Sequence, residues 1–193
     1  GGPLLAAHKA MGAVAYARAE AARLGRAVVP VFWVASEDHD AAEVDRAVVM
    51  DVAGAPRTLA LGLVPDGRSV RDLPLAPDAV ERVLAGLQAA LPPTERTRAA
   101  LSLARPPAGA DLGVWFARVL AACLGDTGLV FVEPVDVAGV VGTTYARLVR
   151  DADRIQEAAL AAGAARRERG EAAPLDPAPG TAPLFVRDAP GGP

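Results

Sequence analysis

The sequence predicts an α/β fold in which helices cover the faces of a mainly parallel sheet. A run of β-branched and aromatic residues, Val28–Ala35, stops abruptly in a polar turn, as a buried strand of a parallel sheet does. A second short apolar run, Leu129–Val132, has the same character. Segments with helical periodicity precede, separate and follow the two runs, and this order is typical of α/β proteins.

Length and composition fit a single domain. The 193 residues are enough to bury a full core, and 52% of them are hydrophobic. No window reaches the uninterrupted apolar run of about 18 residues that a membrane helix needs. A net charge of −3 gives no basic surface for nucleic acid. Cys123 is the single cysteine, which excludes an internal disulfide and fits a reducing compartment. We expect a soluble, cytoplasmic protein that binds neither nucleic acid nor a membrane.

The first predicted element is a helix over Pro3–Leu24. Apolar residues recur at three- and four-residue spacing, Pro3 suits the first turn, and Gly25 suits the C-cap. His8 and Lys9 fall in the second turn. A histidine on a helix is usually a packed or surface residue, and a lone lysine is usually a solvated charge. Lys9 also lies one turn inside a helix N-terminus, which can bind anions.

Four titratable side chains follow the first strand directly: Glu37, Asp38, His39 and Asp40. Open α/β sheets bind ligands at the carboxyl ends of their strands, and like charges held this close repel one another. This junction is therefore the main site candidate, suited to binding an amine or sugar hydroxyls or to general acid–base chemistry. The alternative is helix capping, since Asp40 and Glu43 form a capping-box-like pair at the start of a short helix, Ala41–Arg46.

The middle of the chain predicts a hairpin and then a helical insertion. Two short strands, Ala47–Val52 and Arg57–Leu63, are joined by a turn too short for a helical crossover. We expect residues 64–110 to leave the sheet as an insertion that contains two helices. These helices are Ala79–Leu91, which Asp78 caps, and Thr94–Ala104.

The strongest helix pattern begins at Asp111. Its apolar face is rich in aromatic residues and includes Cys123, which is expected to be a small core residue and not a reactive thiol. The strand Leu129–Val132 follows and ends in a second acidic pair, Glu133 and Asp136. Glu133 could face the first acidic cluster across the sheet edge, whereas Asp136 is better explained as a cap of the next helix.

The C-terminal part of the sequence predicts one long helix. Apolar residues keep the three- and four-residue spacing from Val140 to Arg169, with a charged side that is expected to face solvent. A proline-rich loop and a short strand, Leu184–Val186, complete a prediction of one domain over residues 1–193.

Several catalytic motifs are absent. The sequence contains no G-x-x-x-x-G-K-[ST] loop, no G-x-G-x-x-G, no H-E-x-x-H and no G-x-S-x-G. Two histidines and one cysteine cannot build the common zinc sites. A hard cation could bind Glu37, Asp38 and Asp40, but nothing else in the sequence supports a metal and we assign no metal-binding residue.

Two stretches of the chain resemble a known family. The helix start at Gly2-Pro3-Leu4 with His8 and Lys9, followed by PVFWVASEDHD at 30–40 and by Glu43-Val44, is similar to the bacillithiol biosynthesis cysteine-adding enzymes, the cysteine ligases BshC. The combination of Phe32-Trp33 with the acidic string at 37–40 is specific to that family. Two later segments fall in the family's order, Gly128–Val132 and Pro183–Val186.

The resemblance implies a Rossmann-like core with connecting insertions and the addition of cysteine to glucosaminyl-malate, which gives the low-molecular-weight thiol bacillithiol. The residues with implied catalytic roles are Glu37, Asp38, His39 and Asp40, and those with implied substrate contacts are Gly2, Pro3, Lys9 and Trp33. The cofactor is left open, with ATP or ADP as candidates. The family also implies a homodimer that forms through a C-terminal coiled coil.

The resemblance is to part of a longer protein. The segment that precedes Gly2 in the family and the coiled coil are missing from this sequence, so we expect a fragment whose own activity and dimerisation are open. The residues taken alone allow two other functions. One is a nucleotide-binding or nucleotidyl-transferring domain of another kind, and the other is a non-catalytic remnant that acts as an interaction module.

Overall fold

The computed structural model describes residues 2–175 and 177–178. The chain divides into two compact units, Gly1–Asp136 and Val137–Pro193. The predicted strand Leu184–Val186 lies outside the described residues. Within the part of the chain that is described, no helix is both long enough and apolar enough to span a bilayer.

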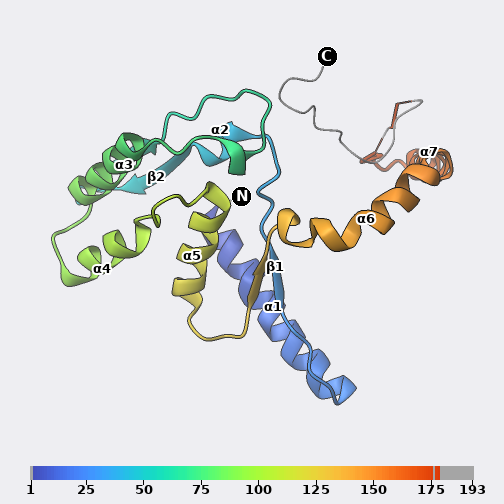
Figure 1. Ribbon diagram of the computed structural model, residues 1–193, viewed down its shortest axis with the longest axis horizontal. Coiled ribbons are helices and arrows are strands. Elements are labelled where there is room, and N and C mark those ends of the chain that lie inside the picture. Colours follow the sequence, from blue (N-terminus) through green and yellow to red (C-terminus); the bar gives the residue numbers. More distant parts are fainter. Residues whose placement is uncertain (1, 176, 179–193) are drawn as a thin grey trace. The chain divides into compact units, whose positions relative to one another are not determined.

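A two-stranded parallel sheet joins distant parts of the first unit (Figure 1). Strand β1, Val31–Trp33, pairs with strand β4, Val130–Val132, and Phe32 lies opposite Phe131. The ring centroids of these two phenylalanines are 5.7 Å apart, so aromatic packing reinforces the register. The predicted parallel pairing of the two apolar runs is confirmed.

Strand β1 is shorter than the predicted Val28–Ala35. Its partner β4 offers only a short edge, because Gly128 has a positive φ of 75° before the strand and Pro134 begins a helix just after it. Val29, which a longer strand would include, is exposed. The length of a strand is thus limited here by its neighbour and not by its own composition.

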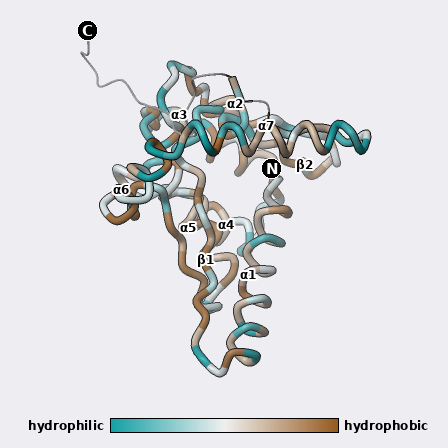
Figure 2. Tube along the Cα trace, turned by 90° about the vertical axis from the view of Figure 1, so that its right-hand side faces the viewer, coloured by the Kyte–Doolittle hydropathy of each residue, from teal (hydrophilic) through white to brown (hydrophobic). Residues whose placement is uncertain are grey.

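Helix α1, Pro3–Leu24, lies along β1 and contacts both β1 and α5 (Figure 2). It begins after Gly2 and ends at Gly25, which has a left-handed φ of 63°, as the sequence predicts. The residues buried beneath it are small and fall on one face: Ala10, Val14 and Ala17. Small side chains let the helix approach the strand closely.

Helix α5, Leu112–Leu124, covers the sheet from another direction. Asp111 caps it by accepting a hydrogen bond from the Val114 N–H at 2.8 Å. The ring of Phe116 packs on Phe32, with centroids 5.9 Å apart. Cys123 is exposed, so its prediction as a core residue is wrong. The apolar face of α5 is wider than the surface that covers it, and Cys123 lies on the uncovered part.

A β-hairpin follows the acidic loop. Helix α2, Ala41–Val44, leads into antiparallel strands β2, Arg46–Met50, and β3, Pro56–Ala60. The sequence prediction of a short helix and a hairpin is confirmed. The two strands form a ribbon separate from the parallel pair, since each described sheet has two strands.

The carboxylate of Asp51 closes the hairpin turn and gives it a pH dependence. It accepts the N–H groups of Ala53 and Ala55, both at 2.9 Å, and pairs with Arg57 Nε at 2.8 Å. The bond from Ala55, then that from Arg57, holds the pKa of Asp51 below its usual range. Its contribution to stability is therefore present above the unfolded pKa of about 4 and is lost as the pH falls through the lower folded pKa.

We expect Asp51→Asn to remove this part of the acid sensitivity. Carbon-detected NMR titration of the Asp51 carboxyl group should give a midpoint below that of an unstructured aspartate. The difference in Tm between the wild type and Asp51→Asn should narrow as the pH is lowered from about 5 toward 2. A midpoint at or above the ordinary aspartate value would contradict the assignment.

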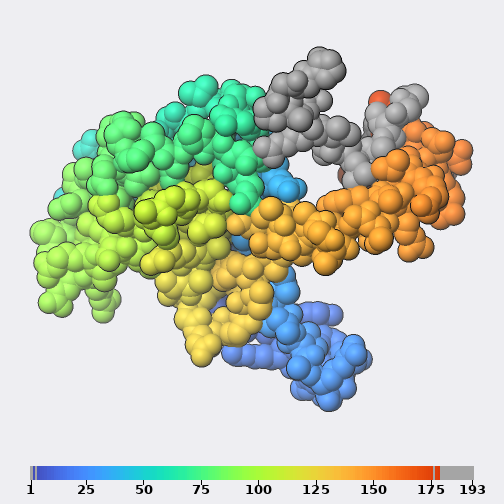
Figure 3. Space-filling model, viewed as in Figure 1, coloured from blue at the N-terminus to red at the C-terminus, as the bar shows by residue number. Residues whose placement is uncertain are grey.

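Residues 64–110 form the helical segment that the sequence predicts. They contain the 3₁₀ helix η1, Val70–Asp72, and the helices α3, Pro77–Ala90, and α4, Glu95–Ala104. Helix α3 packs on β3, and α4 contacts α5, so the green segment adjoins the yellow α5 in Figure 3. Three buried residues form the core between α3 and the hairpin: Leu61, Val80 and Leu84.

The predicted cap of α3 is wrong by two positions. The helix begins at Pro77 after the N-cap Ala76, because proline is favoured in a first helical turn. Asp78 instead lies inside the first turn, where it pairs with Arg82 four residues on. The carboxylate still stabilises the positive end of the helix dipole.

Two helices replace the predicted single one in the described C-terminal residues. Helix α6, Pro134–Arg150, starts at the end of the first unit, and helix α7, Ala152–Glu168, follows it. The break falls at Asp151, whose ψ of 12° departs from helical geometry. The apolar spacing continues through this position, which explains why periodicity alone predicts one helix.

Candidate functional site

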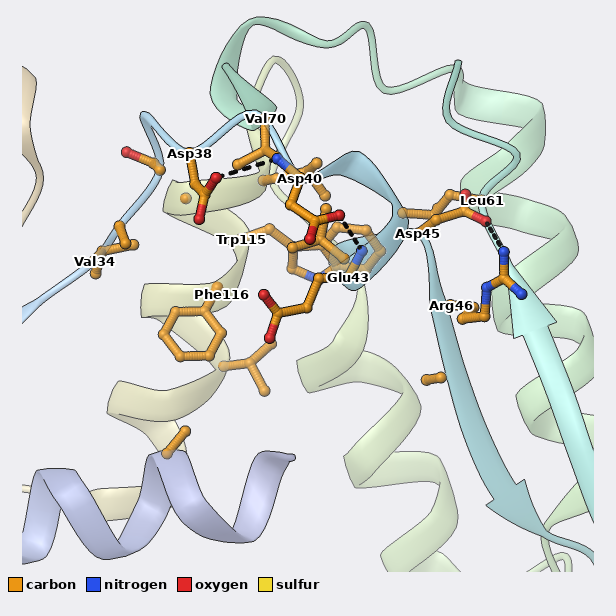
Figure 4. A pocket seen from close by; sticks show the side chains of 18 of the residues that line it. Val34, Asp38, Asp40, Glu43, Asp45, Arg46, Leu61, Val70, Trp115 and Phe116 are labelled. Carbon is orange, nitrogen blue, oxygen red and sulfur yellow. Dashed lines mark hydrogen bonds and ion pairs between the residues drawn. The ribbon is translucent and has the colours of Figure 1, made fainter. Parts of the chain in front are cut away.

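A cavity of about 610 Å³ opens in the first unit at the carboxyl end of β1. This volume falls within the range of small-molecule sites in proteins. Its wall is contributed by α1, β1 and the loop after it, α2, the hairpin, η1, α3 and α5 (Figure 4). Open parallel sheets bind their ligands at this position. The acidic loop thus borders a cavity large enough to hold a small metabolite.

Half of the predicted site residues line this cavity, namely Lys9, Trp33, Asp38 and Asp40. Lys9 comes from the second turn of α1, and Trp33 ends β1 with 53% of its surface exposed. Glu37 and His39 lie on the same loop, but they are exposed and do not belong to the described lining. Gly2 caps α1 and Pro3 is the first residue of that helix.

The acidic loop is shaped by its own carboxylates. Asp38 Oδ1 accepts the N–H of Asp40 at 3.2 Å, and Asp40 Oδ1 accepts the N–H of Glu43 at 3.1 Å. The second bond is the predicted cap of α2, which is confirmed. His39 Nδ1 lies 3.6 Å from Asp38 Oδ1, and 79% of the His39 side chain is exposed. Asp40 therefore caps a helix and lines the cavity at once.

Two aromatic residues of α5 complete the wall opposite the loop, Trp115 and Phe116. The indole Nε1 of Trp115 donates to the carbonyl oxygen of Ala104 at 2.7 Å, which fixes the plane of the ring. Figure 4 shows the side chains of Asp40 and Glu43 pointing toward the region where the rings of Trp115 and Phe116 lie. The cavity combines a largely apolar wall with a few polar groups, which is the usual make-up of a ligand site.

Acidic groups outnumber basic ones around the cavity. The acidic lining residues are Asp38, Asp40, Glu43 and Asp45, and the basic ones are Lys9 and Arg46. Carboxylates accept hydrogen bonds and attract cations, so this surplus favours a ligand with an ammonium group or several hydroxyls. Across the described residues, no three His, Cys, Asp or Glu side chains are grouped so that they could hold a metal ion.

A partly buried polar cluster, here called the strand-end network, lies where β1 and β4 end. It consists of Ser36, Arg71, Asp111 and Glu133. Ser36 Oγ donates to Glu133 Oε2 at 2.5 Å, and the guanidinium of Arg71 bridges Glu133 Oε2 at 3.4 Å and Asp111 Oδ2 at 2.9 Å. Ser36 is 2% exposed and Glu133 is 9% exposed. The network joins both strand ends to η1 and to the start of α5.

The sequence suggests only one member of this network, Glu133, as a residue facing the first acidic cluster. In the structure Glu133 binds Ser36, which immediately precedes that cluster, and not the side chains of residues 37–40. Asp136 accepts the Glu133 N–H at 2.8 Å from the first turn of α6, which is the reciprocal bond of a capping box. Arg71 was missed because it lies in a loop without periodicity, and Trp115 because its spacing is that of a core residue.

Comparisons with known proteins agree on one family. A sequence model of the family described as "Bacillithiol biosynthesis BshC, N-terminal Rossmann-like domain" matches residues 1–189, which confirms the expected Rossmann-like α/β fold. Three relatives carry the name "Putative cysteine ligase BshC". That of Symbiobacterium thermophilum is 35% identical over 96% of this chain and 36% of its own length. Those of Desulforamulus reducens and Salinibacter ruber are both 32% identical, over 81% and 88% of this chain and 29% and 32% of their own lengths. The chain thus spans about a third of these relatives.

Proposed function

The chain belongs to the family of bacillithiol biosynthesis BshC N-terminal Rossmann-like domains, and from this premise we propose that it acts in a cysteine ligase that adds cysteine to glucosaminyl-malate. The reaction forms a carbon–nitrogen bond between the cysteine carboxyl group and the sugar amine. The single observation that carries this proposal is the cavity at the carboxyl end of β1, bordered by the loop that holds the family's Glu-Asp-His-Asp string. Its size suits a sugar conjugate, and its acidic surplus suits an amine.

We propose that the acidic loop binds the sugar amine and accepts its proton. Asp38 and Asp40 line the cavity and accept hydrogen bonds from the sugar ammonium and hydroxyl groups. An amine attacks a carbonyl only in its neutral form, so a proton acceptor is needed, and the imidazole of His39, 3.6 Å from Asp38 Oδ1, takes this role. Glu37, on the same loop, adds negative charge that holds the substrate ammonium near the rim.

We propose that Lys9 and Trp33, which also line the cavity, contact the rest of the substrate. The ammonium of Lys9 neutralises the malate carboxylates, and the exposed indole of Trp33 packs against the sugar ring. Gly2 and Pro3 form the turn that starts α1 and thereby orient the helix that carries Lys9. The roles of Lys9 and Trp33 are separable, because Lys9 comes from α1 and Trp33 from β1.

Further proposals concern the whole protein. We propose that the two units belong to one Rossmann-like domain, since the family match runs through both. We also propose a cytoplasmic enzyme that forms a homodimer in its complete form and takes cysteine and glucosaminyl-malate as small-molecule substrates. ATP or ADP is the candidate cofactor, because joining a free carboxylate to an amine requires activation of the carboxylate.

A thiol profile of cells tests the proposal most broadly. Deletion of the gene that encodes this chain should abolish bacillithiol and raise glucosaminyl-malate, and the intact gene should restore both. Mass spectrometry of alkylated cell extracts measures the two compounds together. Unchanged bacillithiol in the deletion strain would overturn the proposed function.

A further inference from the structure

Arg71 lies at the crossing point of three elements of the first unit. It belongs to η1, and its side chain pairs with Asp111 at the start of α5 and with Glu133 at the end of β4. Only 23% of its side chain is exposed. Buried ion pairs cost desolvation energy, so an arginine held between two carboxylates calls for a structural or functional reason.

The backbone of η1 also binds the acidic loop directly. The N–H of Arg71 donates to the carbonyl oxygen of Ser36 at 3.1 Å, and the N–H of Val70 donates to that of Asp38 at 2.7 Å. These two bonds grip the loop on either side of Glu37. The position of the loop therefore depends on the position of η1. The Arg71 side chain connects η1 to the end of β4 through Glu133, and Glu133 in turn binds Ser36 after β1.

Because Glu133 is buried, its carboxylate requires a cationic partner at position 71. Glu133 is 9% exposed and receives hydrogen bonds from Ser36 Oγ and from Arg71. A carboxylate withdrawn from water needs a compensating positive charge, and Arg71 supplies it through a planar fork that reaches two carboxylates at once. A neutral side chain of similar length could fill the same space, but it would not bridge the carboxylates of Asp111 and Glu133.

Arg71 acts from behind the cavity wall. Ser36, Val70 and Asp38 line the cavity, whereas Arg71, Asp111 and Glu133 are not in the lining that the structure describes. We propose that Arg71 is a positioning residue, which fixes the loop carrying Asp38 and His39 at the rim of the cavity by bridging Asp111 and Glu133. Its effect on catalysis rests on the proposed function, while its effect on the loop does not.

The loop can be observed without any enzyme assay. The chain contains two histidines, His39 on the loop and His8 on α1. In ¹H–¹³C spectra of this chain, Arg71→Met should shift or broaden the His39 imidazole signal and leave that of His8 unchanged. Arg71→Lys, which keeps the charge but loses the fork, should give an intermediate change.

A second variant separates position from stability. Arg71→Met leaves Glu133 buried without its cation and should lower the Tm by about 10 °C. Adding Glu133→Gln removes that charge and keeps an acceptor for Ser36, so the double variant should recover much of the Tm. The His39 signal should stay altered in the double variant, because the bridge from η1 to β4 is still broken.

Steady-state kinetics of the full-length gene product complete the test. Misplacing a catalytic group by about 1 Å can lower the rate by up to about 100-fold. Arg71→Met and the double variant Arg71→Met/Glu133→Gln should therefore each lose about 10- to 100-fold in kcat, with a smaller change in KM. Arg57→Met is the matched control, since it breaks the pair with Asp51 in the hairpin turn, and neither of these residues lines the cavity. It should change neither the His39 signal nor kcat.

The outcomes separate the two proposals. A His39 signal unchanged in Arg71→Met, or a kcat fully restored together with the Tm in the double variant, would overturn the positioning role. A gene product with no ligase activity but with the expected His39 changes would overturn the proposed function and leave the positioning of the loop supported.

Discussion

Alanine at Asp38 or at His39 is expected to lower kcat/KM for the proposed reaction, the addition of cysteine to glucosaminyl-malate, by about 10²- to 10⁴-fold. This is the range that general acid–base groups contribute to catalysis. Both side chains are largely exposed, with 53% of Asp38 and 79% of His39 accessible, so the folded state should lose less than about 1 kcal/mol. Steady-state kinetics and a thermal melt of each purified variant measure the two effects.

Matched controls exist for both substitutions. Asp66 resembles Asp38 in that its Oδ1 accepts the backbone N–H two residues on, from Arg68 at 3.1 Å, but it does not line the cavity. His8 is the other histidine of the chain and is exposed on α1. Asp66→Ala and His8→Ala should keep kcat/KM within about twofold of the wild type. Wild-type turnover in Asp38→Ala and His39→Ala would remove the site assignment.

The substitution Gly113→Ala is expected to destabilise the first unit by about 1–3 kcal/mol, the usual cost of overpacking. Gly113 is buried in the first turn of α5, and a Cβ at this position would lie 2.5 Å from Glu133 Oε2 and 2.9 Å from the Cβ of Ser36. Neither group can move freely, because Ser36 and Glu133 bind each other. Denaturant titration of the purified chain gives the free energy of unfolding.

At a second glycine, substitution by alanine is expected to raise the free energy of unfolding instead of lowering it. Gly12 lies inside α1, and a Cβ there would meet no atom within 4 Å. Gly12→Ala should therefore stabilise the chain by about 0.5–1 kcal/mol through higher helix propensity. If Gly113→Ala stabilised the chain as Gly12→Ala does, the close approach of α5 to the strand-end network would be wrong.

Local signals carry most of what the sequence predicts correctly. Helix α1 has its predicted bounds because Pro3 and Gly25 are strong start and stop signals. The hairpin follows from a turn too short for a crossover, and Asp40 caps α2 because its spacing to Glu43 is that of a capping box. In each case the residues that decide the structure lie within a few positions of one another.

Tertiary context explains what the sequence does not predict. The end of β1 depends on the length of β4, which lies about a hundred residues further on. Cys123 has core spacing, but its side chain is exposed on α5. Arg71 and Trp115 carry no motif, and their positions depend on contacts with other elements, namely Glu133 62 residues further on and Ala104 in the preceding helix. Periodicity reports which face is apolar, not what covers it.

Calorimetric titration of the gene product with glucosaminyl-malate tests the central claim most directly, namely that the loop after β1 presents its carboxylates to an amine-bearing metabolite in the adjacent cavity. Saturable binding to the wild type and to Asp66→Ala is predicted, with affinity lowered at least tenfold in Asp38→Ala. Equal affinity in all three proteins, or no binding to the wild type, would contradict it.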